Sequence, residues 1–249
     1  MTTPWEPNFG FYLTTLDEHP ASFVVDLNAE PTESHSLRLQ LRVPLRTPRA
    51  DGLRDAAELE PMGALEDRIV EALTEKVDAL YVGRLVSRGA TEFFFYVPSE
   101  HGPLLDDLEA LLGPVAPYEV EYLAAEDPDW GMFTEFLYPD AYSLQSIANR
   151  SLLEQLQKAG DVMSVARTID HLAFFESTGQ ANEAASRLKA AGFSTDELDT
   201  REGDRVGLQF HRDDALSDGQ ADAFVAEVLD IIGPLDGEYD GWGCPVVTT

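Results

Sequence analysis

Cysteine and basic residues are scarce in this chain of 249 residues. Its single cysteine, Cys244, leaves no partner for an internal disulfide. That fits a reducing compartment, although a cysteine-poor secreted protein would look the same. Lysine and arginine number 17 against 46 acidic residues, so the formal net charge is −29 at pH 7. Such a charge keeps a chain soluble, repels nucleic acid and anionic lipid, and favours a basic protein surface as a partner.

Targeting signals and catalytic motifs are also missing. Residues 1–6 have neither the basic nor the apolar region of a signal peptide. No apolar run approaches the ~20 residues that span a bilayer, so we expect a cytoplasmic protein. There is no glycine-rich phosphate loop, no His-Glu-x-x-His and no Gly-x-Ser-x-Gly. The sequence therefore predicts a protein that is not an enzyme and that has no catalytic residues, metal or cofactor.

Strand-like and helix-like patterns alternate in both halves of the chain. Residues 36–45 show the strand pattern most clearly, because apolar side chains alternate there with arginine and glutamine. In the first half we expect strands at 9–16, 21–27, 36–45, 80–86, 91–97 and 118–123, and helices at 59–77 and 104–112. In the second half we expect strands at 169–175, 193–198, 206–210 and from 235, and helices at 144–156, 181–191 and 224–232.

This order predicts an α+β fold with two domains, residues 1–140 and 141–249. Each domain would be a ferredoxin-like α/β sandwich with an antiparallel sheet, and the first would carry an extra N-terminal hairpin. Two helices would cover one face of each sheet, which leaves the other face polar or covered by a partner or the neighbouring domain. Residues 126–140 are aromatic and lack periodicity, so we expect them to pack on one of the domains.

Three arginines share one face of the strand at 36–45. Arg38, Arg42 and Arg46 stand at every fourth position, and side chains two or four residues apart on a strand point the same way. They could form an anion site. In so acidic a chain, the more ordinary interpretation is that they pair with neighbouring carboxylates.

Two other groups of side chains leave different functions open. The strands that hold His171 and His211 would be close in one sheet, so with Asp170 or Glu176 they could form a metal or acid/base site. The alternative function is a small-ligand-binding or hydrolytic protein that uses a cleft between its domains, lined by Arg38, Arg42 or His171. The aromatic residues 93–96 would suit RNA binding on an open sheet, but the net charge argues against it because phosphate contacts need basic residues.

A series of short segments in the second half points to a family. They are Leu152-Leu153-Glu154-Gln155-Leu156, Thr168-Ile169-Asp170-His171-Leu172, Ala190-Ala191-Gly192-Phe193, Glu202-Gly203-Asp204-Arg205-Val206 and, most specifically, Glu238-Tyr239-Asp240-Gly241-Trp242-Gly243. In this order, residues 151–246 resemble RraB, the regulator of ribonuclease E activity B. The first 140 residues resemble a domain of unknown function often fused ahead of it, in residues 21–27, 81–84 and 127–130.

The resemblance implies a small, acidic, cytoplasmic protein with a ferredoxin-like fold that binds a ribonuclease and inhibits it without catalysing a reaction. The leading hypothesis is thus a non-enzymatic regulator whose partner is a basic protein surface, with no direct contact to nucleic acid. Aromatic residues are favoured interface anchors, so Tyr239 and Trp242, with Asp240, Gly241 and His171, are the predicted partner-binding residues. Equally, Trp242 could fill the core and Gly241 could form a turn.

Overall fold

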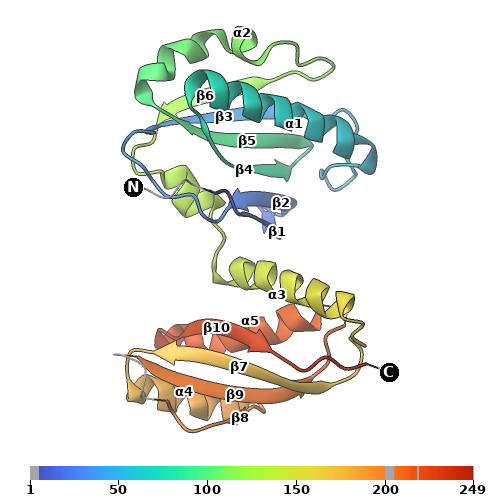
Figure 1. Ribbon diagram of the computed structural model, residues 1–249, viewed down its shortest axis with the longest axis vertical. Helices are drawn as coiled ribbons and strands as arrows, with labels where there is room; N and C mark the ends of the chain where they lie inside the picture. Colours follow the sequence, from blue (N-terminus) through green and yellow to red (C-terminus); the bar gives the residue numbers. More distant parts are fainter. Residues whose placement is uncertain (1–5, 200–204, 218, 249) are drawn as a thin grey trace. The chain divides into compact units, whose positions relative to one another are not determined.

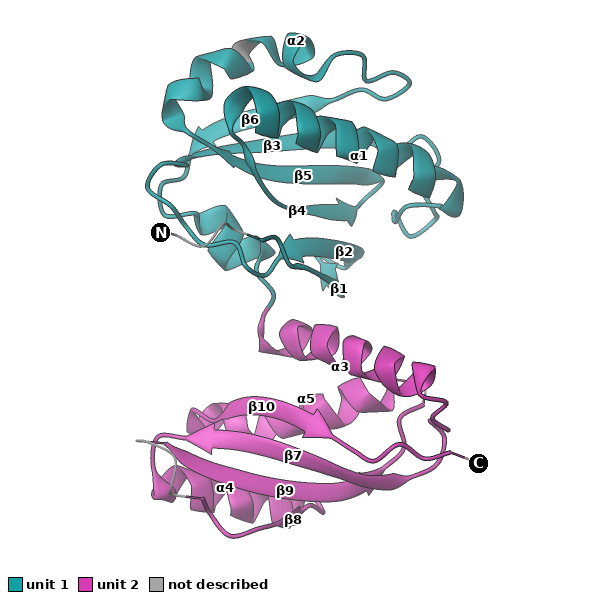
Figure 2. Cartoon of the chain, viewed as in Figure 1, with its two compact units in different colours: residues 1–139 teal, residues 140–249 magenta. Residues whose placement is uncertain are grey.

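The computed structural model describes residues 6–199, 205–217 and 219–248, and the chain divides into two compact units (Figures 1 and 2). Unit 1 comprises Met1–Pro139 and unit 2 comprises Asp140–Thr249. Each unit contains one antiparallel sheet, of six and four strands respectively, so the predicted α+β class is confirmed. Among the described residues, no helix combines the length and apolar character needed to cross a membrane.

The sheet of unit 1 has the strand order β1-β2-β4-β5-β3-β6. Its strands are β1 (Phe9–Leu16), β2 (His19–Asp26), β3 (Leu37–Pro44), β4 (Leu80–Ser87), β5 (Ala90–Val97) and β6 (Glu121–Glu126). The helices are α1 (Ala56–Val77) and α2 (Leu108–Leu112), preceded by a 3-10 segment (Ser99–Asp107). The order β4-β5-β3-β6 agrees with the predicted ferredoxin-like arrangement, and the hairpin β1–β2 extends the sheet beyond β4.

Helix α1 supplies the core on one face of this sheet. The side chain of Asp55 caps its first turn by accepting a hydrogen bond from the Ala57 amide, as N-terminal caps do. Apolar side chains at helical spacing then face the sheet and are fully buried: Met62, Leu65, Ile69, Leu73 and Val77. They pack with Phe93 and Phe95 of β5.

The opposite face of this sheet is not free, which corrects the expectation for unit 1. Phe94 and Tyr96 point to this second face, and a π-helical segment, η2 (Met132–Leu137), covers it together with Trp130. The rings of Tyr96 and Trp130 stack with centroids 3.9 Å apart. Residues 93–96 are at most 1% exposed, so the RNA-binding interpretation of these aromatics was wrong. The expectation that residues 126–140 pack on a domain is confirmed.

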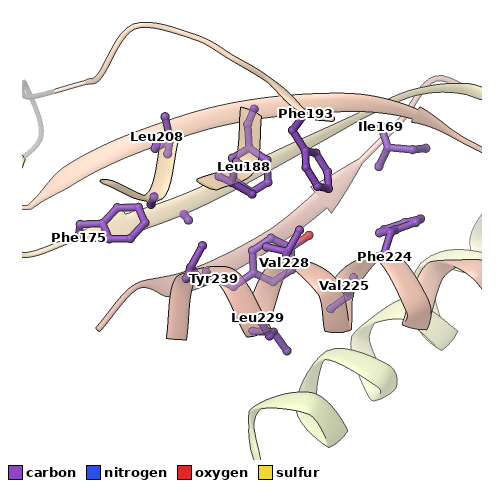
Figure 3. Packing of buried hydrophobic residues seen from close by; sticks show 14 of the residues in the cluster. Ile169, Phe175, Leu188, Phe193, Leu208, Phe224, Val225, Val228, Leu229 and Tyr239 are labelled. Atoms are coloured by element: carbon purple, nitrogen blue, oxygen red, sulfur yellow. The ribbon is translucent and has the colours of Figure 1, made fainter. Parts of the chain in front are cut away.

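Unit 2 begins with a helix and continues with strands and helices in the order βαββαβ. Its elements are α3 (Ala141–Lys158), β7 (Arg167–Phe175), α4 (Thr178–Ala190), β8 (Ser194–Thr195), β9 (Val206–Asp214), α5 (Gln220–Ile232) and β10 (Glu238–Gly243). The strand order β10-β7-β9-β8 again agrees with the predicted ferredoxin-like arrangement. Figure 3 shows the core, in which Phe193, Leu208 and Ile169 face Phe224 and Val228 of α5.

Several predicted elements have different limits, and three of them illustrate the causes. The strand expected at 193–198 contains only the two residues of β8, although the Asp196 amide still donates to the Gln209 carbonyl. The strand expected at 118–123 begins at Glu121. The helix expected at 104–112 is α-helical only from Leu108, after a 3-10 segment that contains Pro103. Both strands, β6 and β8, lie at an edge of their sheet, where pairing limits the chain less than in the centre.

Candidate functional site

One face of the unit 2 sheet has no described element of that unit over it. Helices α4 and α5 lie on the other side, behind β10, β7 and β9 in Figure 2. Along β7, Ile169, His171 and Ala173 are buried toward the helices, while Asp170 is exposed and Leu172 is half-buried on the uncovered side. This is the period-two alternation of a strand with one buried face. We refer to the uncovered side as the open face.

The open face holds a shallow hollow of about 560 Å³ across β7, β9 and β10. Three carboxylates border it, those of Asp170, Asp196 and Asp240, together with Leu172 and Gln209. Asp213 and Glu238 are exposed on the same face, and Arg205 is ion-paired with Glu238 at 2.6 Å. The open face is therefore strongly acidic around a small apolar centre.

A β-bulge in β10 sets the direction of the predicted contact residues. The pairing of β10 with β7 shifts register between Tyr239 and Gly241. Gly241 has φ +127°, a conformation that side-chain-bearing residues rarely adopt. The bulge places Tyr239 and Trp242, although three residues apart, opposite the helix-side residues Ala173 and His171 of β7, while Asp240 between them is exposed.

His171 and Tyr239 form a buried pair beneath the open face. The Nδ1 atom of His171 lies 2.6 Å from the Tyr239 hydroxyl, and its ring stacks on Phe210 with centroids 5.0 Å apart. Its Nε2 atom has no hydrogen-bond partner in the described chain. Burial, with the charge of Arg212 as a smaller cause, lowers the pKa of His171 to about 4, so the ring is neutral at pH 7. Burial also raises the pKa of the Tyr239 hydroxyl.

Trp242 connects β10 to two helices. Its indole Nε1 donates a hydrogen bond to Oδ1 of Asn149 in α3 at 2.6 Å. The buried amide of Asn149 in turn donates to Oδ1 of Asp222 in α5 at 2.8 Å. The Trp242 ring also meets the edge of Phe224, with centroids 5.4 Å apart. Trp242 is therefore held in place by the helices, although it still borders the hollow.

The predicted partner-binding residues thus divide into two groups. Asp240 and Gly241 border the open face, whereas Tyr239 and His171 are buried and Trp242 is half-buried. Sequence reasoning missed Asp196, Gln209 and Leu172, and it considered Asp170 only for a metal or acid/base site. The alternation along β7 was a usable signal for Asp170 and Leu172, but the pairing of β9 with β7 was needed to add Gln209.

Arg38 and Arg42 of β3 and Arg46, which follows the strand, do not form a common anion site in the described contacts. Arg42 forms an ion pair with Glu121 at 3.1 Å and lies 3.9 Å from Glu92. This residue therefore pairs with neighbouring carboxylates, which is the more ordinary of the two interpretations given above. Arg38 is half-buried. Burial acts to raise the pKa of Asp127, but the hydrogen bonds to its carboxylate and, to a smaller degree, the charge of Arg38 hold that pKa below its ordinary value. Arg46 is exposed at the end of the strand.

The catalytic and metal alternatives find no supporting geometry. His171 and His211 are on neighbouring strands, but Asp170 pairs with His211 and His171 pairs with Phe210, so the two imidazoles point to opposite faces. In the described residues, no group of three or more histidine, cysteine, aspartate or glutamate side chains could hold a metal ion. Burial raises the pKa of the Cys244 thiol, which is the opposite of what activates a nucleophile.

The fold and the open face together define a two-unit α+β protein with an acidic, uncovered sheet face. The chain belongs to the family of unknown function DUF695, which its residues 7–138 match. Residues 146–244 match the family described as regulator of ribonuclease activity B. The predicted RraB family domain, preceded by a domain of unknown function, is therefore confirmed. Part of one segment that carried the resemblance, residues 202–204, lies outside the described residues.

Comparison with individual proteins adds little to the family matches. No curated protein matches the chain. Among the solved structures that match are a candidate glycine cleavage system transcriptional repressor (7% identity, 84% of this chain and 98% of that chain, TM-score 0.24) and an unknown protein from Galdieria sulphuraria (9% identity, 85% and 99%, TM-score 0.21). TM-scores this low carry no argument about fold or function.

Proposed function

We propose that this protein is a non-enzymatic regulator that acts in the cytoplasm by binding a ribonuclease of the ribonuclease E type and inhibiting it. The two units would act as separate domains, residues 1–140 and 141–249, and the open face of unit 2 would be the docking surface. The partner surface would be basic, and the regulator would make no direct contact with RNA.

The acidic open face is the observation that supports this proposal. Exposed carboxylates at Asp170, Asp196 and Asp240 surround the half-buried Leu172. An acidic rim accelerates encounter with a basic surface, and a desolvated apolar centre contributes the binding energy. A ribonuclease must offer basic residues to RNA phosphates, so an acidic protein face can compete for them.

The predicted contact residues take different roles in this proposal. Asp240 and Gly241 would touch the partner, because they border the open face. Tyr239, His171 and Trp242 would be positioning residues that hold the bulge of β10 at its place, through the His171–Tyr239 pair and the hydrogen bond from Trp242 to Asn149. The His171–Tyr239 contact and the hydrogen bond from Trp242 to Asn149 both form within unit 2, without a partner protein.

An inhibition assay with charge reversals tests the proposal. The double variant Asp170→Lys/Asp240→Lys should weaken inhibition of the ribonuclease from the same cells by about tenfold or more, since both changes lie in the docking surface. The matched control is Glu154→Lys/Glu183→Lys, which changes the net charge equally on exposed helix positions of the same unit. RNA cleavage and a direct binding measurement would be followed together, at low and moderate salt.

Two results would count against the proposal. If the control weakens inhibition as much as the open-face variant, only the net charge of the protein matters and the open face has no special role. If the unaltered protein neither binds nor inhibits the ribonuclease at low salt, the regulator hypothesis itself is wrong.

A further inference from the structure

A second surface, in unit 1, forms a groove that the proposed regulatory function does not use. The hollow has a volume of about 730 Å³ and lies between α1 and the strands β1, β2 and β4. Its floor is made by Phe9, Val24 and Tyr81, and its wall is one side of α1. We refer to it as the α1 groove.

The α1 groove exists because the sheet is wider than its helical cover. Helix α1 packs over β3, β4 and β5, and the hairpin β1–β2 extends the sheet beyond it (Figure 1). Two strands give a strip about 10 Å wide, which is close to the ~10–12 Å diameter of a helix with its side chains. The strip beside α1 therefore has the width of one more helix in the same layer.

Apolar side chains on the floor are unusually exposed. Phe9 is 45% exposed, although its ring lies 5.6 Å from that of Tyr81. Leu13 continues the same face of β1 and is 58% exposed. On the other face of the same strand, Tyr12 is only 5% exposed. The hairpin thus shows apolar residues on both faces, and only one face is covered within the described part of unit 1.

The wall of the groove is acidic with helical spacing. Asp67, Glu71 and Glu75 are exposed and stand four residues apart on α1, so each carboxylate is about 6 Å further along the helix axis than the last. Glu66 also borders the groove, where it is ion-paired with Arg84 and accepts a hydrogen bond from the Tyr81 hydroxyl at 2.8 Å. Four carboxylates and one guanidinium leave a net charge of −3 on the lining.

We propose that the α1 groove binds a basic amphipathic helix of a partner protein. The apolar face of that helix packs on Phe9, Val24 and Tyr81, and its lysine or arginine side chains, repeated every three or four residues, meet Asp67, Glu71 and Glu75. This is helix-in-groove recognition, in which shape and the row of charges select the partner. A second copy of this chain is a poor occupant, because its net charge of −29 opposes the acidic wall.

Binding of a designed peptide to the full chain tests the proposal. The probe is a labelled 18-residue peptide of leucine and lysine whose leucines all fall on one face of a helix, and fluorescence anisotropy gives its affinity. A scrambled peptide of the same composition is the first control, because a chain this acidic attracts any cationic peptide. The amphipathic peptide should bind about tenfold more tightly than the scrambled one, since only it can bury a continuous apolar face.

Matched substitutions locate the site. Glu71→Lys and Phe9→Ser should each weaken binding of the amphipathic peptide by about tenfold. Glu60→Lys and Leu59→Ser change the same types of exposed residue on α1 outside the groove, and they should leave binding within about twofold. Circular dichroism and thermal melting would verify that all four variants fold as the parent does. Hydrogen exchange should show protection at residues 9–26 and 66–84 when the peptide binds.

Four outcomes would overturn the proposal: no binding of the amphipathic peptide, equal binding of the scrambled peptide, equal weakening by the control substitutions, or protection confined to unit 2. Self-association that Phe9→Ser abolishes would also overturn it, since the occupant would then be a second copy. Ribonuclease inhibition is measured in a separate assay. A negative result for peptide binding to the α1 groove would therefore not count against the proposed docking surface of unit 2.

Discussion

The two sheets of this protein have similar strand connections, but their second faces differ. In unit 1 the strand β5 is buried on both faces, with Phe93 and Phe95 against α1 and with Phe94 and Tyr96 beneath Trp130 and the segment η2. In unit 2 the strands β7 and β9 are buried on the helix side only. This difference in burial follows from the sequences of the strands. The aromatic run at residues 93–96 places apolar side chains on both faces of β5, so both faces must be covered, whereas β7 alternates and has only one apolar face to bury.

This contrast places potential binding surfaces in different positions. Unit 1 covers the second face of its sheet over β5, and beside α1 it leaves the strip of β1 and β2 exposed. Unit 2 leaves its whole second face uncovered by its own described elements and surrounds it with carboxylates. Three predictions test whether the contrast in burial is also a contrast in stability.

The largest effect is expected from Trp130→Ala. This side chain is fully buried, stacks on Tyr96 and donates a hydrogen bond from Nε1 to the His35 carbonyl at 2.7 Å. Removing it should lower the free energy of unfolding of unit 1 by about 3–5 kcal/mol, because a cavity and an unpaired carbonyl remain. Denaturant unfolding followed by hydrogen exchange, which resolves the two units, measures the loss.

Hydrogen exchange in unit 2 serves as the internal control for this variant. Its protection should remain within about 0.5 kcal/mol of the parent value, because the ring contacts and the hydrogen bond of Trp130 are made with residues of unit 1. A loss below about 1 kcal/mol in unit 1 would mean that the segment around Trp130 is not a required cover for the sheet.

The next effect in size is a pH dependence confined to unit 2. His171 has a pKa of about 4 in the folded protein against an ordinary value of 6.5. The unfolded chain therefore takes up the proton first, and the stability that the neutral ring supports is complete above pH 6.5 and is lost as the pH falls toward 4. The loss attributable to His171 should be about 2–3 kcal/mol.

A double variant separates this contribution from the general acid sensitivity of the carboxylates. His171→Phe/Tyr239→Phe replaces both members of the buried pair by apolar rings, so it should change stability little at pH 7. Between pH 6.5 and 4, unit 2 of the variant should lose less stability than unit 2 of the parent, as measured by urea unfolding at each pH. Parallel pH curves for the two proteins would show that His171 does not titrate in this way.

Much of this architecture could be predicted from local pattern. The alternation in residues 36–45 and the helical spacing of Met62, Leu65 and Ile69 identify strand and helix because burial of one face follows the geometry of each element. The cover provided by Trp130 and η2 could be expected only in general terms, since a π-helical segment has no periodic signal. The opposite directions of His171 and His211 depend on strand register, which local sequence does not specify.

The candidate site was predicted less completely than the fold. The segment from Tyr239 to Trp242 lies in one strand that borders the hollow, but its aromatic side chains pack toward the helices. Aromatic residues favour both interfaces and cores, so residue type alone could not decide between them. The bulge at Asp240 directs Tyr239 and Trp242 toward the core. The position of a bulge depends on the neighbouring strand as much as on the sequence of the bulged strand itself.

The smallest effect is expected from Leu172→Ala, and Phe94→Ala on the second face of the other sheet serves as its comparison. Leu172→Ala, on the open face of β7, should destabilise unit 2 by about 1 kcal/mol or less, because its side chain is only half-buried. Phe94→Ala, on the covered second face of β5, should destabilise unit 1 by about 3 kcal/mol or more. Both would be measured by urea unfolding with hydrogen exchange at pH 7, at several protein concentrations.

The ratio of these two losses matters more for function than either value. A small loss at Leu172 means that the open face is solvated in the isolated protein and is available to a partner. A loss as large as that of Phe94→Ala would mean that something already covers Leu172 in solution. If that loss grew with protein concentration, the cover would be a second copy, and a ribonuclease would have to displace it before the open face could act as a docking surface.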